Sequence, residues 1–281
     1  MSRNDQKMSK DEIFKDTDAE AGSFEFNKAV ADVFPDMLRR SIPGYDASID
    51  AIGALAARYV QPGTRCYDLG CSLGAATIAM RRNISAPDCE IHAVDLAPAM
   101  VQRCRREVEK LEGTTPVSVS LADIRDIDIK HASMVVMNYT LQFLPVAERV
   151  SVISRIREGM TEGGVFVLSE KVADEDPAVE ALLIDLHHEF KRSNAYTDLE
   201  ISRKRTALEN VLIPETIATH LERLSAAGFA HSGVWLSISI LSPSSRFASC
   251  AGRRFSFRGT GQDRSRILAA AAVIFNSRTP R

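Results

Sequence analysis

The chain has 281 residues, and 45% of them are apolar, which is close to the average for globular proteins and allows a sizeable core. A typical domain has about 100–200 residues, so we expect one large domain with extensions. A formal net charge of -2 gives no overall basic footprint for nucleic acid. No apolar run approaches the ~20 residues of a membrane span, and the first residues lack the apolar stretch of a signal peptide. These features predict a cytoplasmic protein that neither binds nucleic acid directly nor enters a membrane.

The cysteines show no Cys-x-x-Cys spacing. They are Cys66, Cys71, Cys89, Cys104 and Cys250. An odd number of cysteines without an export signal favours reduced cytosolic thiols over a disulfide framework or a zinc site. We therefore expect no bound metal.

Two helical segments are expected before the first strand. Residues 1–22 are polar and charged with almost no apolar periodicity, so we expect them to be mobile. From Phe24 the apolar residues recur at helical spacing, until the pair Pro43-Gly44 breaks the chain. A second helical pattern covers residues 49–60 and leads into the first strand.

The middle of the chain alternates short apolar runs with amphipathic segments. The expected strands are residues 65–69, 91–95, 117–121, 133–138 and 165–169, with a turn at Gly163-Gly164 before the last of them. The fourth run is apolar throughout, as a strand covered on both faces should be. This alternation predicts an α/β fold with a doubly wound, mainly parallel sheet and right-handed crossovers.

The last third of the chain differs in composition. Residues 174–210 form a helical, charge-rich block that is inserted before a core helix at 216–227, which Gly228 ends as a C-cap. Residues 231–240 are expected to form a further strand. An insertion after the fifth strand lies near the carboxyl ends of the strands, where open α/β sheets bind ligands.

A Gly-x-x-x-Gly turn joins the first strand to its helix, in the run Tyr67-Asp68-Leu69-Gly70-Cys71-Ser72-Leu73-Gly74-Ala75-Ala76. Glycine has no Cβ, so it can take a positive φ and let the backbone approach a nucleotide-like ligand. Asp95 ends the next strand, where a carboxylate can accept the ribose hydroxyls. Asp123 and Ile124 follow the third strand and are placed to flank an adenine. Together these spacings predict a site for S-adenosylmethionine (SAM); nicotinamide enzymes carry the denser Gly-x-Gly-x-x-Gly fingerprint.

Other polar residues near this site have two interpretations. Cys71 is interpreted as a small buried thiol under the ligand rather than a nucleophile, because no histidine is near it in sequence. His187-His188 are adjacent on a helix and point about 100° apart, so we interpret them as structural or surface residues rather than metal ligands. The inserted block also carries basic residues, which form either a solvated face or a clamp for an anionic substrate. These are Lys191, Arg192, Arg203, Lys204 and Arg205.

From about Phe24 to Trp235 the chain closely resembles the carboxy-S-adenosyl-L-methionine synthases. Seven runs carry the resemblance besides the glycine turn: Val33-Phe34-Pro35-Asp36-Met37, Ser41-Ile42-Pro43-Gly44-Tyr45, Asp123-Ile124-Arg125-Asp126-Ile127, Asn138-Tyr139-Thr140-Leu141-Gln142-Phe143-Leu144, Leu168-Ser169-Glu170-Lys171, His187-His188-Glu189-Phe190-Lys191-Arg192 and Lys204-Arg205. The resemblance implies a Rossmann-like class I methyltransferase fold with a seven-stranded sheet, N-terminal helices and a helical insertion after strand five, within residues 23–235.

The resemblance implies a reaction of SAM with prephenate, giving carboxy-SAM, phenylpyruvate and water. Carboxy-SAM then serves the modification of the tRNA wobble uridine (cmo5U34). It also implies a homodimer without a metal. By the same resemblance, Arg205 holds the transferred carboxylate and is the candidate catalytic residue. The implied SAM contacts are Tyr45, Gly70, Cys71, Ser72, Asp95, Leu96, Asp123, Ile124, Asn138 and Arg205.

Three of these positions have alternatives. Tyr45 can equally be a packed loop aromatic, and Asn138 at a strand end can be a helix N-cap. Leu96 replaces the polar residue expected at its position, which a backbone N–H contact tolerates and a side-chain contact does not.

The tail from about Leu236 departs from the family. Residues 232–281 contain no Lys or Glu while arginines accumulate, so 236–281 form an atypical Arg/Ser-rich tail. We hypothesise that a frameshift produced it; the alternative is a genuine basic extension that touches RNA. Two other functions stay open, namely a SAM-dependent methyltransferase of a small carboxylic acid and a non-catalytic SAM-binding subunit.

Overall fold

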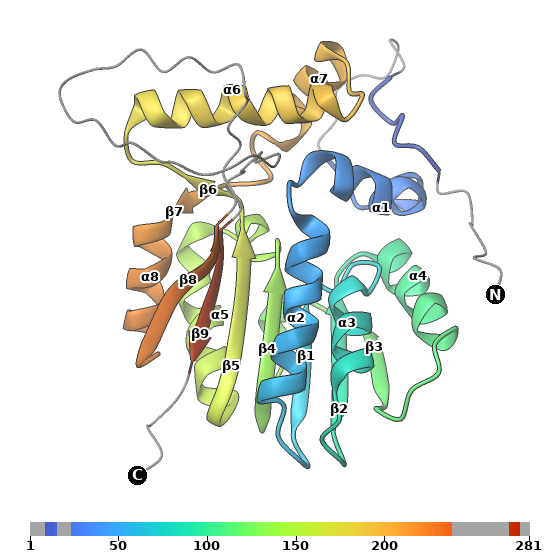
Figure 1. Ribbon diagram of the computed structural model, residues 1–281, viewed down its shortest axis with the longest axis vertical. Helices are drawn as coiled ribbons and strands as arrows, with labels where there is room; N and C mark the ends of the chain where they lie inside the picture. The colour runs from blue at the N-terminus through green and yellow to red at the C-terminus, as the bar shows by residue number, and fades with distance from the viewer. Residues whose placement is uncertain (1–8, 16–23, 238–269, 276–281) are drawn as a thin grey trace, which may run out of the picture.

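A computed structural model describes residues 9–15, 24–237 and 270–275 of the chain. Its centre is a sheet of seven strands in the order β3-β2-β1-β4-β5-β9-β8 (Figure 1). The first five are parallel, and β9 is antiparallel to both β5 and β8. The strands are β1 (Arg65–Leu69), β2 (Glu90–Asp95), β3 (Val117–Leu121), β4 (Ala132–Asn138), β5 (Met160–Glu170), β8 (His231–Ser237) and β9 (Ala270–Phe275). The doubly wound, mainly parallel α/β fold predicted from the sequence is confirmed.

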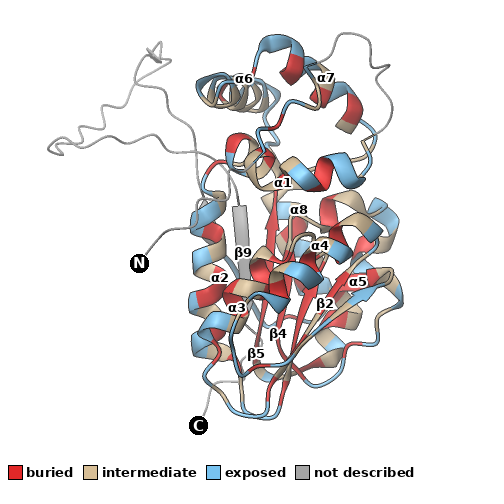
Figure 2. Cartoon of the chain, turned by 90° about the vertical axis from the view of Figure 1, so that its right-hand side faces the viewer, coloured by how far each residue is buried: buried red, intermediate tan, exposed pale blue. Residues whose placement is uncertain are grey.

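Helices cover both faces of the sheet (Figure 1). One face carries α2 (Tyr45–Tyr59), α3 (Ala75–Asn83) and α4 (Pro98–Glu109), and the other carries α5 (Val146–Gly159) and α8 (Ile217–Ala226). Successive residues of a strand point to opposite faces. Met134 and Val136 of β4 therefore pack in the α2–α3 cluster, whereas Val135 and Met137 pack in the α5–α8 cluster. Figure 2 shows the buried residues concentrated in these central strands.

A third group of helices lies across the carboxyl ends of the strands (Figure 1). It consists of α1 (Lys28–Ser41), α6 (Pro177–Ser193) and α7 (Asp198–Leu208), the last two from the inserted block. A capping box between Thr197 and Glu200 starts α7, and Asp176 caps α6 before Pro177. Only Leu186 of α6 is buried, so this helix covers the end of the sheet without joining its core. The block is tied down by a two-stranded sheet of β6 (Val172–Ala173) and β7 (Glu215–Thr216).

Several boundaries differ from the sequence-based expectation, among them the start of α2 at Tyr45 rather than at residue 49, and two of the differences have a clear physical reason. Gly163-Gly164 does not form a turn before the fifth strand, because β5 already begins at Met160. The positive φ of Gly163, +73°, and a register shift against β4 let the strand continue through this point. The first helix begins at Lys28 rather than near Phe24, because the Asn27 side chain accepts the Val30 N–H and fixes the start.

The chain ends are described only in part. Residues 9–15 of the expected mobile segment instead pack against the fold: Asp11 is buried, and its carboxylate accepts from the Tyr196 hydroxyl. The rest of that segment lies outside the described residues, as do 238–269 and 276–281 of the tail. The strand expected at 231–240 is described as β8 up to Ser237. None of the described helices is long and apolar enough to cross a membrane.

Candidate active site

A cavity of about 1190 Å³ lies at the carboxyl ends of the strands. Its walls come from the ends of β1, β2 and β4, and helices α1, α6 and α7 contribute the opposite side. All of the residues that the sequence predicts for a site line this one cavity. They are Tyr45, Gly70, Cys71, Ser72, Asp95, Leu96, Asp123, Ile124, Asn138 and Arg205. Their positions are thus brought together, while their individual contacts with a ligand stay predictions.

The glycine turn forms the floor of the cavity. Gly70 has a φ of +82°, and its N–H and that of Cys71 both donate to the Val94 carbonyl. A Cβ on Gly70 would lie 2.3 Å from the Thr140 hydroxyl oxygen, so only glycine fits between these two segments. Cys71 is buried, and hydrogen bonding to Cys104 and burial raise the pKa of its thiol. A thiol that stays protonated agrees with a packing role.

Asp68, below the turn, fixes the start of α3. Its carboxylate accepts the Thr77 N–H at 2.9 Å and the Thr77 hydroxyl at 2.5 Å. Gly74, the N-cap of α3, has no side chain to cap the helix, so the buried Asp68 takes over that function. Burial raises the pKa of this carboxyl to about 6. The turn is therefore held rigidly between β1 and α3.

Asp95 is fixed by backbone groups at the end of β2. Its two carboxylate oxygens accept the Ser72 N–H at 2.8 Å and the Ala97 N–H at 2.9 Å. Each oxygen keeps a lone pair that can accept a ligand hydroxyl. Burial raises the pKa of Asp95. Leu96 beside it lines the cavity and is 64% exposed.

Asp123 already has a cationic partner. It caps the short helix η1 (Ile124–Asp126) by accepting the Arg125 N–H, and it pairs with the Arg125 guanidinium at 2.6 Å. The hydrogen bond from Arg125 lowers the pKa of the Asp123 carboxyl. Glu148 of α5 holds the other side of Arg125 at 2.7 Å. Arg125 therefore orients Asp123, a role that the sequence motif alone did not reveal.

Asn138 carries an unmatched acceptor in the cavity. It is the last residue of β4, and its Oδ1 is buried without a hydrogen-bond partner among the described residues. It is not a helix cap, because Thr140 holds the N-cap position of the next turn, η2 (Leu141–Phe143). Buried polar atoms in proteins almost always have a hydrogen-bond partner, from the protein, a water molecule or a ligand. The structure therefore fits a ligand that donates a hydrogen bond to Asn138.

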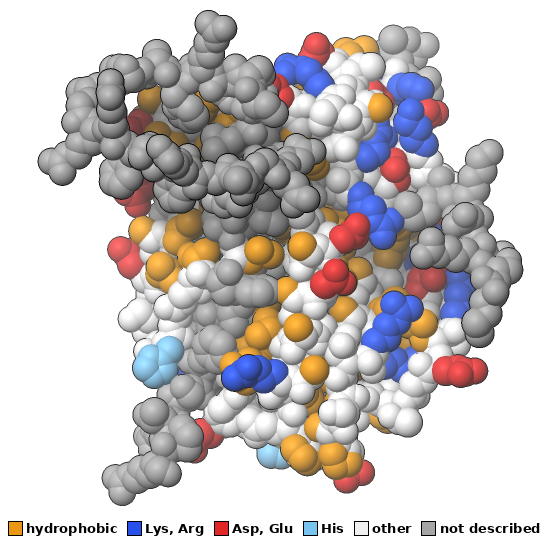
Figure 3. Space-filling model, in the orientation of Figure 1, with side chains coloured by type: hydrophobic (Ala, Val, Ile, Leu, Met, Phe, Trp, Pro, Cys, Tyr) orange, Lys and Arg blue, Asp and Glu red, His pale blue; other side chains and the backbone are white. Residues whose placement is uncertain are grey.

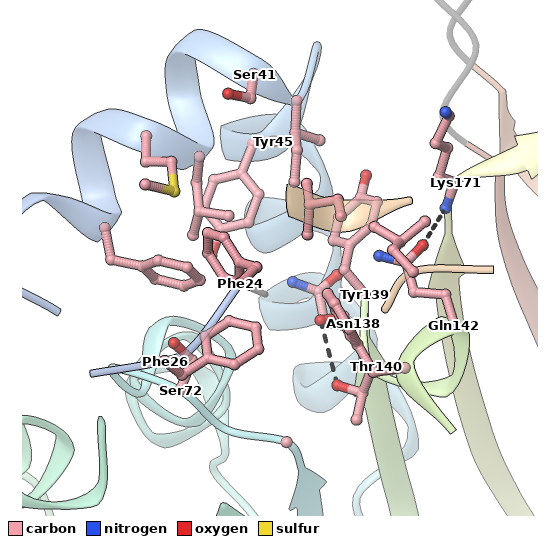
Figure 4. A pocket seen from close by; sticks show the side chains of 18 of the residues that line it. Phe24, Phe26, Ser41, Tyr45, Ser72, Asn138, Tyr139, Thr140, Gln142 and Lys171 are labelled. Carbon is pink, nitrogen blue, oxygen red and sulfur yellow. Dashed lines mark hydrogen bonds between the residues drawn. The ribbon is translucent and has the colours of Figure 1, made fainter. Parts of the chain in front are cut away.

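Aromatic side chains line the wall next to Asn138 (Figure 4). Tyr45 is the first residue of α2 rather than part of a loop, and its ring lies 6.4 Å from that of Tyr139. Phe26 makes edge contacts with the rings of Phe24 and Phe143. Burial raises the pKa of the Tyr45 hydroxyl, so this wall is uncharged. The sequence signal for these phenylalanines was helical periodicity only.

A buried carboxylate shapes the cavity beyond β5. Glu170 accepts the N–H groups of Leu141 and Gln142 at 2.9 and 3.0 Å, and the Gln142 side chain accepts the Lys171 N–H. Burial raises the pKa of the Glu170 carboxyl to about 8. These bonds fix the turn after β4 against the end of β5. The sequence motif contained these residues, but their connection depends on the tertiary fold.

The basic residues of the inserted block divide into two groups. Lys191, Lys204 and Arg205 line the cavity. Arg192 lies outside it and pairs with Asp198, and Arg203 donates to the Phe14 carbonyl. The interpretation as a solvated face therefore fits Arg192, which is exposed, but not Lys204, which is buried.

Comparison with known proteins gives the family. Residues 67–164 match the family model of a methyltransferase domain. A carboxy-S-adenosyl-L-methionine synthase from Escherichia coli is 52% identical over 226 residues, which are 80% of this chain and 92% of the relative. One from Klebsiella pneumoniae subsp. pneumoniae is 50% identical over the same shares. The chain belongs to the carboxy-S-adenosyl-L-methionine synthase family. The resemblance stated from the sequence is thereby confirmed.

Solved structures of other members of the fold are more distant. An O-methyltransferase family protein from Burkholderia thailandensis has a TM-score of 0.57 and 16% identity, covering 91% of this chain and 62% of that one. The cyclopropane synthase MmaA2 from Mycobacterium tuberculosis has a TM-score of 0.50 and 16% identity, covering 67% of this chain and 62% of that one. These similarities concern the fold alone.

Proposed function

We propose that this protein converts SAM and prephenate into carboxy-SAM, phenylpyruvate and water. One observation carries the proposal: the SAM-type residues of the sheet and the basic residues of the inserted block line the same cavity. Its volume of about 1190 Å³ exceeds the usual ~300–1000 Å³ of a small-molecule site, which leaves room for a second substrate beside SAM.

The proposed chemistry balances without a metal or a redox partner. A C–H bond of the sulfonium methyl group breaks, and the positive sulfur stabilises the resulting carbanion. That carbanion forms a C–C bond to the carbon dioxide that leaves prephenate. The hydroxide lost from prephenate takes the methyl proton and becomes water, so phenylpyruvate is the remaining product.

The residues of the cavity support such a reaction by holding and shielding the reactants. In this proposal Asp95, Asn138 and the glycine turn orient SAM, and Arg205 holds the transferred carboxylate; that all of them line one cavity supports these roles. The aromatic wall of Phe24, Phe26 and Tyr45 keeps water away from a carbanion. We further propose a cytoplasmic homodimer whose product supplies the carboxymethyl group for the tRNA wobble uridine.

Mass spectrometry of the nucleoside released after incubation with SAM, with and without prephenate, tests the proposal. We expect a prephenate-dependent species that is heavier than SAM by one carboxyl group. S-adenosylhomocysteine formed with a small carboxylic acid would instead indicate a methyltransferase. Unchanged SAM, together with thermal stabilisation of the protein by SAM, would indicate a non-catalytic SAM-binding subunit.

A further inference from the structure

The side of the cavity opposite the glycine turn carries an excess of positive charge. Lys171 follows β5, His188 and Lys191 lie on α6, and Lys204 and Arg205 lie on α7; all line the cavity. Lys204 has partners, since its ammonium group donates to the Ser41 hydroxyl at 3.0 Å and lies 3.6 Å from the Asp11 carboxylate. The side chains of Lys171, Lys191 and Arg205 form no hydrogen bond or ion pair within the part of the chain that the structure describes.

These cations lie close enough to repel one another. Burial lowers the pKa of Lys171, and the nearby Arg205 lowers it further. Burial also lowers the pKa of Lys191 to about 7, with Lys204 and Lys171 as the neighbouring charges. Two partly buried ammonium groups without a hydrogen-bonded anion are unfavourable in a cavity, unless an anion binds there.

Few carboxylates face this group. Glu180 of α6 favours the charged form of Lys171, but it is also bound to the Asp174 N–H at 2.8 Å. Among the described residues, Glu209, just after α7, and Glu25, whose neighbour Phe24 donates its N–H to the Ala207 carbonyl of α7, also line the cavity. On the face in Figure 3, the described Lys and Arg side chains are scattered, some of them beside Asp and Glu, and form no large patch of one sign. The cations of the inserted block and of the end of β5 therefore gather at this side of the cavity.

We propose that Lys171 and Lys191 form a carboxylate subsite for the carboxyl donor, separate from the carboxylate that Arg205 holds. This inference rests on the proposed function and deepens it: prephenate is a dicarboxylate, and the subsite holds the carboxylate that stays in phenylpyruvate. One carboxyl group is transferred, and the second anchors the donor between the end of β5 and α6. The Lys171 backbone is fixed by its N–H bond to Gln142 (Figure 4), so the subsite is built on a rigid strand end.

Calorimetric titration of prephenate into the full chain saturated with S-adenosylhomocysteine tests the subsite without turnover. Lys171→Met and Lys191→Met should each weaken prephenate binding about 10- to 100-fold, as expected for loss of a hydrogen bond to a charged group. Their affinity for S-adenosylhomocysteine should stay within about twofold, which also reports that they fold. Lys191→Arg should restore most of the prephenate affinity.

Arg192→Met is the matched control, because Arg192 neighbours Lys191 on α6 but pairs with Asp198 outside the cavity. It removes the same charge and should leave prephenate binding unchanged. The subsite is overturned if Lys171→Met and Lys191→Met bind prephenate as tightly as Arg192→Met does. A wild-type protein that binds prephenate through both lysines but forms no carboxy-SAM would support the subsite and refute the proposed function.

Discussion

The ammonium group of Lys191 combines burial with like-charged neighbours, and this combination determines when it carries a charge. The charged groups that face it are Lys204 of α7 and Lys171 after β5. His187 and His188 lie on its own helix, and burial lowers the pKa of both, so they are neutral near pH 7. With a pKa of about 7, Lys191 is charged and able to hold a carboxylate at lower pH, and neutral at higher pH.

We therefore expect kcat/KM for prephenate to fall as the pH rises above about 7, by up to tenfold per pH unit if Lys191 alone controls binding. Lys191→Arg should remove this fall near pH 7, since arginine stays protonated. Initial rates of carboxy-SAM formation between pH 6 and 9 measure both profiles. Coinciding profiles for the two proteins would contradict the assignment. Arg192→Met serves again as the control and should follow the wild type.

Also at the scale of single residues, the sequence predicted which residues line the cavity better than it predicted their hydrogen-bond and ion-pair partners. The predicted residues follow strand ends, and parallel strands bring their carboxyl ends to one edge, so Gly70, Asp95 and Asn138 could be predicted to meet. The bond of Arg125 to Glu148 of α5, and the bonds from the turn after β4 to Glu170, join segments whose contact depends on tertiary packing. Single-sequence patterns carry no signal for such contacts.

Among the elements, the glycine turn makes the closest approach to its neighbours. Gly70→Ala places a Cβ 2.3 Å from the Thr140 hydroxyl oxygen and 2.9 Å from its Cβ, at a φ of +82°. We expect a loss of about 2–4 kcal/mol in unfolding free energy, from positive-φ strain plus overpacking. SAM binding should fall at the same time, because the displaced Thr140 follows Asn138. Urea unfolding and SAM titration measure the two effects.

The variant Gly63→Ala tests the effect of positive-φ strain without a steric clash. Gly63 has a similar φ of +70°, but nothing lies within 4 Å of an added Cβ. This variant should lose only about 1–2 kcal/mol and bind SAM normally. Equal losses in Gly63→Ala and Gly70→Ala, with SAM binding intact in both, would show that the contact with Thr140 has no consequence.

The elements themselves were predictable to different degrees. Strands β1 and β3 match the expected bounds, because short apolar runs between turn residues have few other solutions in an α/β chain. The start of β5 was wrong, because Gly163 reads as a turn in sequence yet lies inside a strand with a register shift. A glycine with positive φ occurs both in turns and at irregular points of strands, and only the pairing with β4 shows which of the two forms here.

At the scale of the whole molecule, the sheet closes with a segment of the atypical tail. The strand order of the parallel half follows from alternating strands and helices. The identity of the strand between β5 and β8 does not, because residues 270–275 lie far along the chain from both. β9 pairs with β5 from Val165 to Glu170 and with β8 from His231 to Ser237. The origin of the tail by frameshift stays a hypothesis.

A chain that ends at residue 269 lacks β9, whereas one that ends at residue 275 keeps it. Without β9 the backbone groups of β5 lose their antiparallel partner beside a buried core that includes Phe166 and Leu168. Unpaired backbone groups cost about 1–3 kcal/mol each when they stay buried, and a whole domain is stable by only ~5–15 kcal/mol. We therefore expect the shorter chain to aggregate or to unfold at a temperature lower by more than about 10 °C, and the longer chain to behave like the full protein. Thermal unfolding and size-exclusion chromatography of the two proteins decide the matter, and equal midpoints would show that β9 does not stabilise the sheet.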